Sequence, residues 1–307
     1  MNSGSICAVI VTYNRKLLLV ECLKALLNQS QSLNAIYIIN NASTDGTEDY
    51  LEQQGWLDNE LIHLFSLSEN LGGAGGFSFG VEKAYQNGFD YIWLMDDDGC
   101  PAHDCLEILL SHMDKNCYLG PLVLDKDNPN DLCFPMRIPN TLNLINNISD
   151  LKNLPDPNII NGIVIPFNGI LFSCNLVKKI GIPKKEYFIW GDDFEYTKRA
   201  EINRFKIATI TKARFYHPKE SSLGTPMLLG KLKFNDTPSN LKLYCMCRNS
   251  IVNHSIYNTK LHILAFIFKV VWFYLFTKPN SKKLFISLRA IYHGLKKDFR
   301  HHKEYLK

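Results

Sequence analysis

The chain has 307 residues, of which 46% are hydrophobic and 21% charged, and its formal net charge is +4. This length allows one large domain with an appendage or two modest domains, and the composition is that of a globular protein. The nine cysteines form no Cys-x-x-Cys pair, which argues against a usual zinc site and favours reduced thiols in a cytosolic protein. Because no basic stretch followed by an apolar run opens the chain, we expect no secretory signal.

Along the first hundred residues, strand-like and helix-like patterns alternate. The expected strands are 6–11, 35–39, 61–67 and 91–95, and the expected helices are 16–27, 48–54 and 77–86. This order predicts an α/β fold with a mostly parallel sheet of the mononucleotide-binding type, flanked by helices. Residues 121–166 are rich in Asn, Pro and Asp, and we expect loops and short strands there, which could include a flap near the acceptor.

The strand at 91–95 runs directly into Asp96, Asp97 and Asp98. In an open parallel sheet these carboxylates emerge at the C-terminal edge, where ligands bind. Carboxylate oxygens suit hard divalent ions such as Mg²⁺ or Mn²⁺, and Mg²⁺ is often shared with the phosphates of a substrate. The alternative is a solvated acidic turn before the helix that starts near His103.

A glycine-rich segment, Asn-Leu-Gly-Gly-Ala-Gly-Gly at 70–76, lies between the third strand and the next helix. Glycines let the backbone approach a ligand, and the following helix N-terminus favours an anion such as a diphosphate. No Gly-Lys-Ser/Thr follows, so the segment is not a Walker loop. The alternative is tight packing of the helix on the sheet.

Two further features carry candidate chemistry. The segment 190–196 places Asp192, Asp193 and Glu195 at the start of an expected helix, beside Trp190. Such a cluster can supply a general base that deprotonates a hydroxyl nucleophile, although acids in a first turn also stabilise a helix. His217 follows an apolar run, and a neutral imidazole can complete a carboxylate-rich metal site.

The end of the chain is strongly basic: residues 260–307 hold 11 Lys and Arg against 2 acids, whereas the preceding residues hold 23 basic and 28 acidic groups. Residues 261–276 are almost wholly apolar and aromatic, but shorter than the roughly 20 residues of a spanning helix. We expect this region to lie on an anionic membrane surface, with Trp272 and Tyr274 as anchors, and expect no nucleic-acid partner. The alternative is a buried core helix followed by an amphipathic surface helix. The cations expected near lipid headgroups are Lys278, Lys282, Lys283, Arg289, Lys296, Lys297 and Arg300.

Together these motifs resemble one family. The segments 9–15 (Val-Ile-Val-Thr-Tyr-Asn-Arg), 40–47, 70–77 and 93–99 are similar to those of inverting glycosyltransferases of family 2, which have the GT-A fold. The glycine-rich segment, the triple aspartate, Trp-Gly-Asp-Asp and His217 narrow the resemblance to the bacterial branch of galactofuranosyltransferases and rhamnosyltransferases. The resemblance covers roughly residues 6–250, and Tyr244-x-x-x-Arg248-Asn249 is a further feature of this branch.

The resemblance implies a role for each matching position. The donor-binding residues would be Thr12, Asn14, Arg15, Asn40, Asn70, Gly72, Gly73, Asp96 and Asp97. Asn40 stands where many members have an aspartate that contacts the base. Asp98 and His217, with Asp96, would hold Mn²⁺ or Mg²⁺, and Asp193 would be the catalytic base. The acceptor and sugar pocket would be formed by Trp190, Asp192 and Glu195.

We therefore expect a metal-dependent inverting glycosyltransferase of cell-surface glycan synthesis, with a UDP- or dTDP-sugar donor and a lipid-linked saccharide acceptor. The favoured donor is UDP-galactofuranose, and the alternative enzyme is a dTDP-rhamnose transferase. Two different classes of protein also stay open, namely a non-catalytic subunit that binds nucleotide sugars and a nucleotidyltransferase. The expected catalytic domain spans residues 1–230, with a nucleotide-sugar half to about residue 100 and an acceptor half at 101–230. Residues 231–307 would form a helical region peripheral to the inner face of the cytoplasmic membrane.

Overall fold

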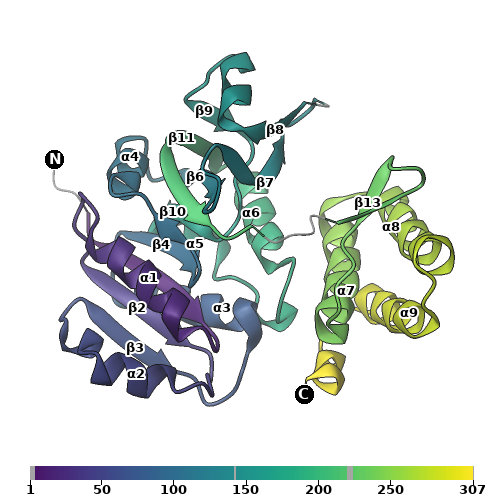
Figure 1. Cartoon of the computed structure of the whole chain (residues 1–307), viewed down its shortest axis with the longest axis horizontal. Coiled ribbons are helices and arrows are strands. Elements are labelled where there is room, and N and C mark those ends of the chain that lie inside the picture. The colour runs from purple at the N-terminus through teal and green to yellow at the C-terminus, as the bar shows by residue number, and fades with distance from the viewer. Residues whose placement is uncertain (1–3, 142, 220–223, 307) are drawn as a thin grey trace. The chain divides into compact units, whose positions relative to one another are not determined.

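The computed structural model describes residues 4–141, 143–219 and 224–306. The chain, which is coloured by residue number in Figure 1, divides into two compact units. The first unit contains Met1–Pro183 and Tyr196–Lys219, and the second contains Lys184–Glu195 and Glu220–Lys307. Helix α6 (Asp192–Ile202) therefore begins in the second unit and continues in the first. The expected domain boundary near residue 230 stays a prediction.

The N-terminal half of the first unit is a parallel sheet with the strand order β3-β2-β1-β4, which confirms the predicted α/β fold. The strands are β1 (Ile6–Thr12), β2 (Ala35–Asn40), β3 (Ile62–Ser66) and β4 (Tyr91–Asp96). The connecting helices are α1 (Lys16–Leu27), α2 (Thr47–Gln53) and α3 (Gly72–Gln86), with the short η1 (Trp56–Asp58) after α2. Each predicted strand and helix of this half is present, with ends that differ by a few residues.

The sheet continues beyond β4 as a mixed sheet. Strand β10 (Asn168–Ser173) is antiparallel to β4 and to β6 (Cys117–Asp125), and β6 is parallel to β11 (Lys206–His217). The remaining strands are β5 (Cys100–Pro101), β7 (Asp131–Arg137), β8 (Leu144–Asn147) and β9 (Ile159–Asn161). The remaining helices are α4 (Cys105–Ser111), η2 (Ile148–Asn153) and α5 (Cys174–Ile180). Short strands do occur within 121–166 as expected, but the nine-residue strand β6 enters this segment and is buried along its whole length.

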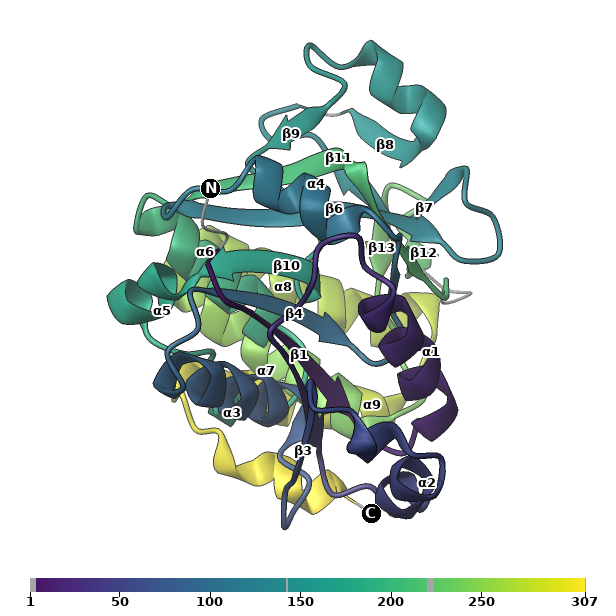
Figure 2. The same ribbon diagram turned by 90° about the vertical axis from the view of Figure 1, so that its left-hand side faces the viewer.

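Both faces of the parallel half are covered, as the turned view in Figure 2 shows for α1 and α3. Ile6, Ala8 and Ile10 of β1 belong to the same core cluster as Leu19 and Leu23 of α1. The alternate residues of β1 pack with α3 instead, because successive side chains of a strand point to opposite faces. Every residue of β1 is therefore buried, and its polar C-terminal end emerges at one edge of the sheet.

The glycine-rich segment is helical in the structure, which corrects the expected loop: α3 begins at Gly72 rather than at residue 77. A Cβ atom on Gly76 would lie 2.5 Å from Cγ1 of Val11 in β1. Gly76 therefore has a packing role, because it lets α3 approach the sheet closely. At Gly76, therefore, the alternative given above is correct: the glycine allows tight packing of the helix on the sheet.

The second unit is built on three helices, α7 (Asn240–Tyr257), α8 (Lys260–Trp272) and α9 (Ser281–Leu295), around one apolar core. It also contains η3 (Lys185–Tyr187), β12 (Thr225–Met227), β13 (Leu232–Phe234), η4 (Phe273–Thr277) and η5 (Arg300–Tyr305). Gly294 brings α9 close to α7, since a Cβ atom there would lie 2.6 Å from the carbonyl oxygen of Arg248. The segment Lys260–Thr277 is long and apolar enough to cross a membrane by length and composition alone.

The structure corrects one of the two expected membrane anchors, Tyr274, and leaves Trp272 a prediction. Tyr274 is buried and donates a hydrogen bond to Asp236 at 2.9 Å, and Trp272 packs partly against the core of the second unit. Val270 and Phe273 are also buried, so one side of this segment is core, as the alternative held. The opposite side exposes large apolar residues.

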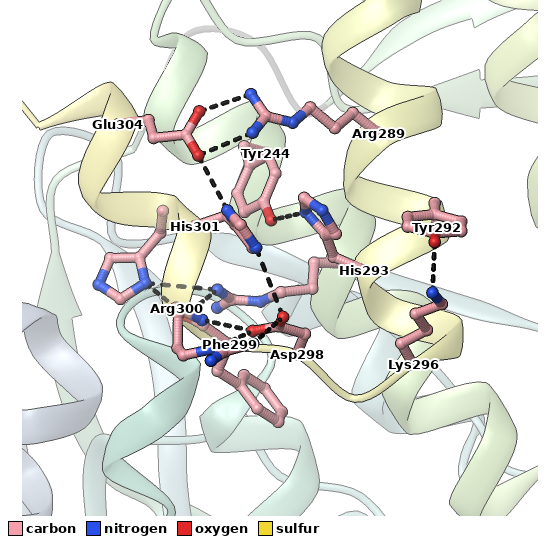
Figure 3. Close-up of polar contacts among 12 residues, drawn as sticks. Tyr244, Arg289, Tyr292, His293, Lys296, Asp298, Phe299, Arg300, His301 and Glu304 are labelled. Carbon is pink, nitrogen blue, oxygen red and sulfur yellow. Dashed lines mark hydrogen bonds and ion pairs between the residues drawn. The ribbon is translucent and has the colours of Figure 1, made fainter.

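Four of the cations expected near headgroups are ion-paired within the second unit. Lys278 and Lys283 contact Asp236 at 2.7 and 2.6 Å. Arg289 binds both carboxylate oxygens of Glu304, and Arg300 binds Asp298, as drawn in Figure 3. The charge that this region can offer to a membrane is therefore smaller than the residue count suggests.

Candidate active site

The loops that follow β1, β2 and β3 are tied together by asparagine side chains. Asn14 accepts a hydrogen bond from the backbone N–H of Thr44 at 2.7 Å. Asn41 accepts from the N–H of Leu71 at 2.9 Å and donates to Asn70 at 3.0 Å. These short polar side chains fix the C-terminal edge of the parallel strands, where an α/β sheet binds its ligands.

The expected donor residues Asn40 and Asn70 also have structural partners. The amide oxygen of Asn40 accepts from the N–H of Ser43 at 3.0 Å, and its NH₂ group donates to Ser66 at 3.3 Å. Asn70 accepts from the N–H of Gly72 at 2.8 Å, which helps to start α3. A Cβ atom on Gly73, by contrast, would have no neighbour within 4 Å, so this turn of α3 is open to a ligand.

The three aspartates after β4 differ in their surroundings. Asp97 is buried, accepts a hydrogen bond from the hydroxyl of Thr12 at 2.7 Å, and lies 3.3 Å from Nη1 of Arg15. The same Nη1 atom lies 2.7 Å from Oδ2 of Asp98. The first unit thus brings the end of β1, the start of α1 and the end of β4 into one charged cluster.

His217, at the end of β11, completes this cluster. Its Nε2 atom lies 3.2 Å from Oδ1 of Asp98, which is an ion-pair distance. That oxygen is buried and makes no hydrogen bond within the described part of the chain. Oδ1 of Asp98 and Nε2 of His217 therefore face each other directly.

The orientation of His217 is fixed on the other side of its ring. Nδ1 lies 2.7 Å from the carbonyl oxygen of Pro218, to which only a protonated nitrogen can donate, and 3.5 Å from Sγ of Cys133. The ring of Phe134 packs against the imidazole at 5.3 Å between centroids. With Nδ1 directed at this carbonyl oxygen, Nε2 is the ring nitrogen that faces Asp98.

Burial and neighbouring charges shift the pKa values of the three aspartates in different directions. Burial, followed by the charges of Asp98 and Asp97, raises the pKa of Asp96 to about 8. Burial also raises the pKa of Asp97 to about 6, against the opposing effects of Thr12 and Arg15. Burial alone would raise the pKa of Asp98, but His217 and Arg15 lower it below its usual range.

His217 shows the complementary effect. Its burial alone would lower the pKa, but the neighbouring Asp98 carboxylate and Cys133 thiol raise it to about 10. The acidic cluster therefore gathers protons and cations to offset its negative charge, as expected for closely spaced carboxylates.

No group of three His, Cys, Asp or Glu side chains in residues 4–141, 143–219 and 224–306 is arranged to hold a metal ion, but the side chains of Asp98 and His217 are of the types that bind divalent ions. Asp98 and His217 supply one oxygen and one nitrogen ligand, a set suited to Mn²⁺. Mg²⁺ commonly takes only one or two carboxylates from the protein and completes its shell with water and substrate phosphates. Two protein ligands, Asp98 and His217, would therefore suffice for an ion whose other ligands are water molecules and substrate phosphates.

The segment before α6 belongs to the second unit and has an uncommon backbone. Phe188 and Trp190 have positive φ angles of 66° and 64°, which are unfavourable for bulky side chains. The carbonyl oxygen of Trp190 accepts a hydrogen bond from Nδ2 of Asn249 at 2.5 Å, and that of Gly191 accepts from Asn253 at 2.9 Å. Helix α7 thus holds the segment that leads to Asp192 and Asp193.

Arg248 completes this support. It is fully buried and donates to the carbonyl oxygens of Tyr187 at 2.7 Å and Phe299 at 3.1 Å. Asn249 donates to the same Tyr187 carbonyl at 3.0 Å. In the sequence, Arg248 and Asn249 belong to a motif of the family branch, which by itself predicts no role for them. Their partners at Tyr187 and Trp190 lie about 60 positions earlier in the chain, so residue spacing carries no signal for these contacts.

The acids at the start of α6 are not equivalent. Burial raises the pKa of Asp193, while the backbone N–H groups of Phe194 and Gly191 oppose the shift. Glu195 is completely buried, and its Oε1 atom lies 3.0 Å from Nζ of Lys184 and accepts from Tyr257 at 2.8 Å. Glu195 therefore has structural partners in the second unit, and Asp193 accepts a hydrogen bond from the backbone N–H of Phe194 at 2.6 Å.

Comparison with known proteins identifies the chain. The family described as "Glycosyl transferase family 2" matches residues 7–164. The chain is 30% identical over 302 residues to the galactofuranosyltransferase GlfT1 of Mycobacterium tuberculosis (strain ATCC 25618 / H37Rv), covering 96% of this chain and 97% of the relative. The chain belongs to glycosyltransferase family 2. GlfT1 of Mycolicibacterium smegmatis is also 30% identical, over 80% of this chain and 81% of that relative.

The fold of this family 2 glycosyltransferase is also found in solved structures. The crystal structure of GalNAc-T7 with UDP, GalNAc and Mn²⁺ matches with a TM-score of 0.64 at 14% sequence identity, over 96% of this chain. The match covers 56% of that chain, so the present protein spans about half its length. This likeness supports the GT-A architecture that the sequence motifs imply.

Proposed function

We propose that this family 2 glycosyltransferase is an inverting, divalent-metal-dependent hexosyltransferase that uses UDP-galactofuranose as donor. The acceptor in this proposal is a lipid-linked saccharide of a cell-surface glycan, at the inner face of the cytoplasmic membrane. The main support is the 30% identity to galactofuranosyltransferase GlfT1 over almost the whole of both chains. The charged cluster at the C-terminal edge of β4 supplies the chemical support.

In the proposed reaction the acceptor hydroxyl oxygen attacks the anomeric carbon of the donor from the side opposite the diphosphate. A carbon–oxygen bond forms to the acceptor, and the bond to the diphosphate breaks, so that UDP leaves. The hydroxyl proton passes to the carboxylate of Asp193, whose raised pKa makes it a better proton acceptor than an ordinary aspartate. Trp190 and Asp192 are the proposed neighbours of the acceptor and the sugar.

The donor would lie at the C-terminal edge of the parallel strands. We assign the nucleotide and diphosphate to the loops that carry Thr12, Asn14, Asn40 and Asn70, and to Gly73 at the open first turn of α3. Asp98 and His217, with Asp96 beside them, are the proposed ligands of Mn²⁺ or Mg²⁺. When bound, the ion would neutralise charge on the departing diphosphate.

The proposal is tested with a panel of UDP- and dTDP-sugars, using purified enzyme and measuring nucleotide release with and without a divalent ion. We expect UDP-galactofuranose to be consumed fastest and EDTA to stop the reaction. Preference for dTDP-rhamnose would replace the donor assignment with the alternative. Donor binding without any turnover, even with acceptor present, would favour a non-catalytic subunit.

The membrane part of the proposal rests on an exposed apolar face of α8, η4 and α9. This face consists of Leu261, Leu264, Phe268, Leu275, Phe276, Phe285, Leu288, Tyr292 and Leu295, which are between 42% and 71% exposed. Within α8 and within α9 the residues recur at three- and four-residue spacing, so each set shares one side of its helix. Large exposed apolar patches on a protein commonly mark interaction surfaces.

The surrounding charge favours anionic lipid as the partner of this apolar face. Lys282, Lys296 and Lys297 take part in no ion pair among the residues that the structure describes. Lysine side chains beside an apolar helix face suit binding in the plane of a membrane. The buried Val270, Phe273 and Tyr274 hold the other side of the segment in the protein core, which argues for a helix lying on the membrane rather than crossing it.

A further inference from the structure

Arg15 occupies a chemically important position in the charged cluster of the first unit. It precedes α1, and its Nη1 atom lies between Oδ2 of Asp98 at 2.7 Å and Oδ1 of Asp97 at 3.3 Å. The side chain of Arg15 is 46% exposed, whereas those of Asp97 and Asp98 are 4% and 14% exposed. A half-solvated cation therefore neutralises two carboxylates that are largely buried.

Asp98 consequently has a nitrogen atom of another side chain at each of its two oxygens. Arg15 contacts Oδ2, and His217 faces Oδ1 at 3.2 Å. A divalent ion that uses Oδ2 of Asp98 as a ligand must compete with the guanidinium of Arg15, because like charges repel at such distances. His217 is held by Pro218 and Cys133, so it is the less displaceable of the two.

We propose that Arg15 is the resting counter-ion of Asp98, and that divalent metal displaces its guanidinium from this carboxylate. The displaced guanidinium then pairs with the anionic diphosphate that the metal accompanies. This inference rests on the proposed metal-dependent function and adds an exchange of partners at the same site. A guanidinium suits both partners, since its donors match carboxylate and phosphate oxygens.

The exchange makes Arg15 act in opposite directions on two ligands. Before the donor arrives, its charge opposes metal binding at Asp98. Once the metal and the diphosphate are both present, the same charge favours the nucleotide. A residue that only held the loop after β1 in place would affect both ligands in the same direction.

The test measures Mn²⁺ binding to the full-length protein by electron paramagnetic resonance, first without nucleotide and then with UDP. Arg15→Gln removes the competing charge, and we expect it to bind Mn²⁺ about fivefold more tightly without nucleotide, as for loss of a modest ion pair. With Mn²⁺ saturating, the same variant should bind UDP on the order of tenfold more weakly. Arg15→Lys keeps the charge and should show no gain in Mn²⁺ affinity.

Lys16→Gln is the matched control. Lys16 is the next residue, and its Nζ atom donates to the carbonyl oxygen of Asp45 rather than to the acidic cluster. Its Mn²⁺ affinity should equal that of the wild type. Thermal unfolding of each variant, followed by circular dichroism, checks that the first unit remains folded.

The outcomes separate the two proposals. If Arg15→Gln is folded and binds Mn²⁺ no more tightly than the wild type, while Mn²⁺ still promotes UDP binding, the partner exchange is wrong and the metal site stands. If no variant binds Mn²⁺ and the wild type turns over in EDTA, both the exchange and the proposed metal dependence are wrong.

Discussion

The side-chain amide of Asn249 donates a hydrogen bond to the carbonyl oxygen of Trp190 at 2.5 Å. Trp190 has a positive φ angle of 64°, which costs of order 1–3 kcal/mol for a bulky residue and persists only when its surroundings hold it. Asn249 therefore stabilises the backbone turn that precedes Asp192 and Asp193, the residues to which we assign acceptor binding and proton transfer.

The first prediction concerns this support. Asn249→Ala should lower sugar transfer about 100-fold, because misplacing a catalytic group by about 1 Å has effects of that size. Mn²⁺ and UDP binding, assigned to the first unit, should change little. Steady-state transfer kinetics and UDP titration measure the two effects. Ser255→Ala is the control on the same helix, since the hydroxyl of Ser255 donates to the carbonyl oxygen of Val252 in its own helix, and it should leave transfer unchanged.

Asp193→Asn is predicted to keep donor binding and to lose transfer by about 10²- to 10⁴-fold, the typical contribution of a general base. Glu201→Gln, an exposed change in the same helix, should have no such effect. Because the pKa of Asp193 is raised, the rate of the wild type should rise with pH through a value above that of an ordinary aspartate. An Asp193→Asn enzyme within a few-fold of wild type would move the base to another residue.

Asp98→Asn and His217→Gln are predicted to weaken metal-dependent UDP binding, since the first removes the carboxylate charge and the second removes the ring nitrogen of the pair that faces each other at 3.2 Å. Calorimetric titration of UDP with and without Mn²⁺ measures the effect. Binding without the metal should be nearly unchanged in both variants. A loss of the same size with and without metal would point to a role in folding or in direct nucleotide contact.

The fourth prediction concerns the stability of the second unit, where Asp236 accepts from Tyr274 at 2.9 Å and pairs with Lys278 and Lys283. Burial alone would raise the pKa of Asp236, but these partners lower it. A lowered folded-state pKa gives stability that is present above the unfolded value of about 3.9 and is lost as pH falls through the folded value. Asp236→Asn should therefore destabilise the protein at pH 7 by about 1–3 kcal/mol, allowing for the exposure of Lys278.

Denaturant unfolding at several pH values tests this sign. The difference between wild type and Asp236→Asn should shrink below about pH 4, where the unfolded wild type takes up a proton, and should be lost as the pH falls through the lowered folded-state pKa. Glu186→Gln, an exposed change in the same unit, is the control. A gap that stays constant down to about pH 2 would show that the charge of Asp236 is not the cause.

The fifth prediction concerns the apolar face. Wild-type protein should sediment with vesicles that contain anionic lipid, and added salt should weaken this binding without removing it, because the apolar contacts persist. Leu264→Asp combined with Phe268→Asp should abolish binding while leaving UDP binding intact. Ile202→Asp, an equally exposed change on α6, is the control. Wild type that ignores anionic vesicles at low salt but self-associates would assign the face to a second copy of the chain.

The parallel half of the fold can be predicted from sequence because its signals are local. Continuous apolar runs and leucines at helical spacing define β1, α1, β2 and β4 within a few residues. The carboxylates after β4 also lie where the sequence places them, since the end of a buried parallel strand must reach the edge of the sheet. The glycine-rich segment was expected to be a loop because glycine lowers helix propensity. It is helical in the structure, and the reason Gly76 is needed there, its close contact with Val11 of β1, involves a residue distant in the sequence.

Other features depend on partners distant in sequence. The contact of Arg15 with Asp98 spans 83 positions, and that of Asn249 with Trp190 spans 59, so neither leaves a spacing pattern. Tyrosine is a residue type typical of membrane anchors, yet the hydroxyl of Tyr274 donates a hydrogen bond to Asp236 and its ring is buried. Residue type indicates which chemistry is available, and the tertiary fold decides which side chains meet.

The most direct test of the central claim is the reaction of purified enzyme with UDP-galactofuranose and a lipid-linked saccharide acceptor in the presence of Mn²⁺, followed by proton NMR. We predict UDP and a galactofuranosyl product in equal amounts, with an anomeric configuration opposite to that of the donor and no product in EDTA. A product with retained configuration, or transfer that proceeds equally well without metal, would contradict the account.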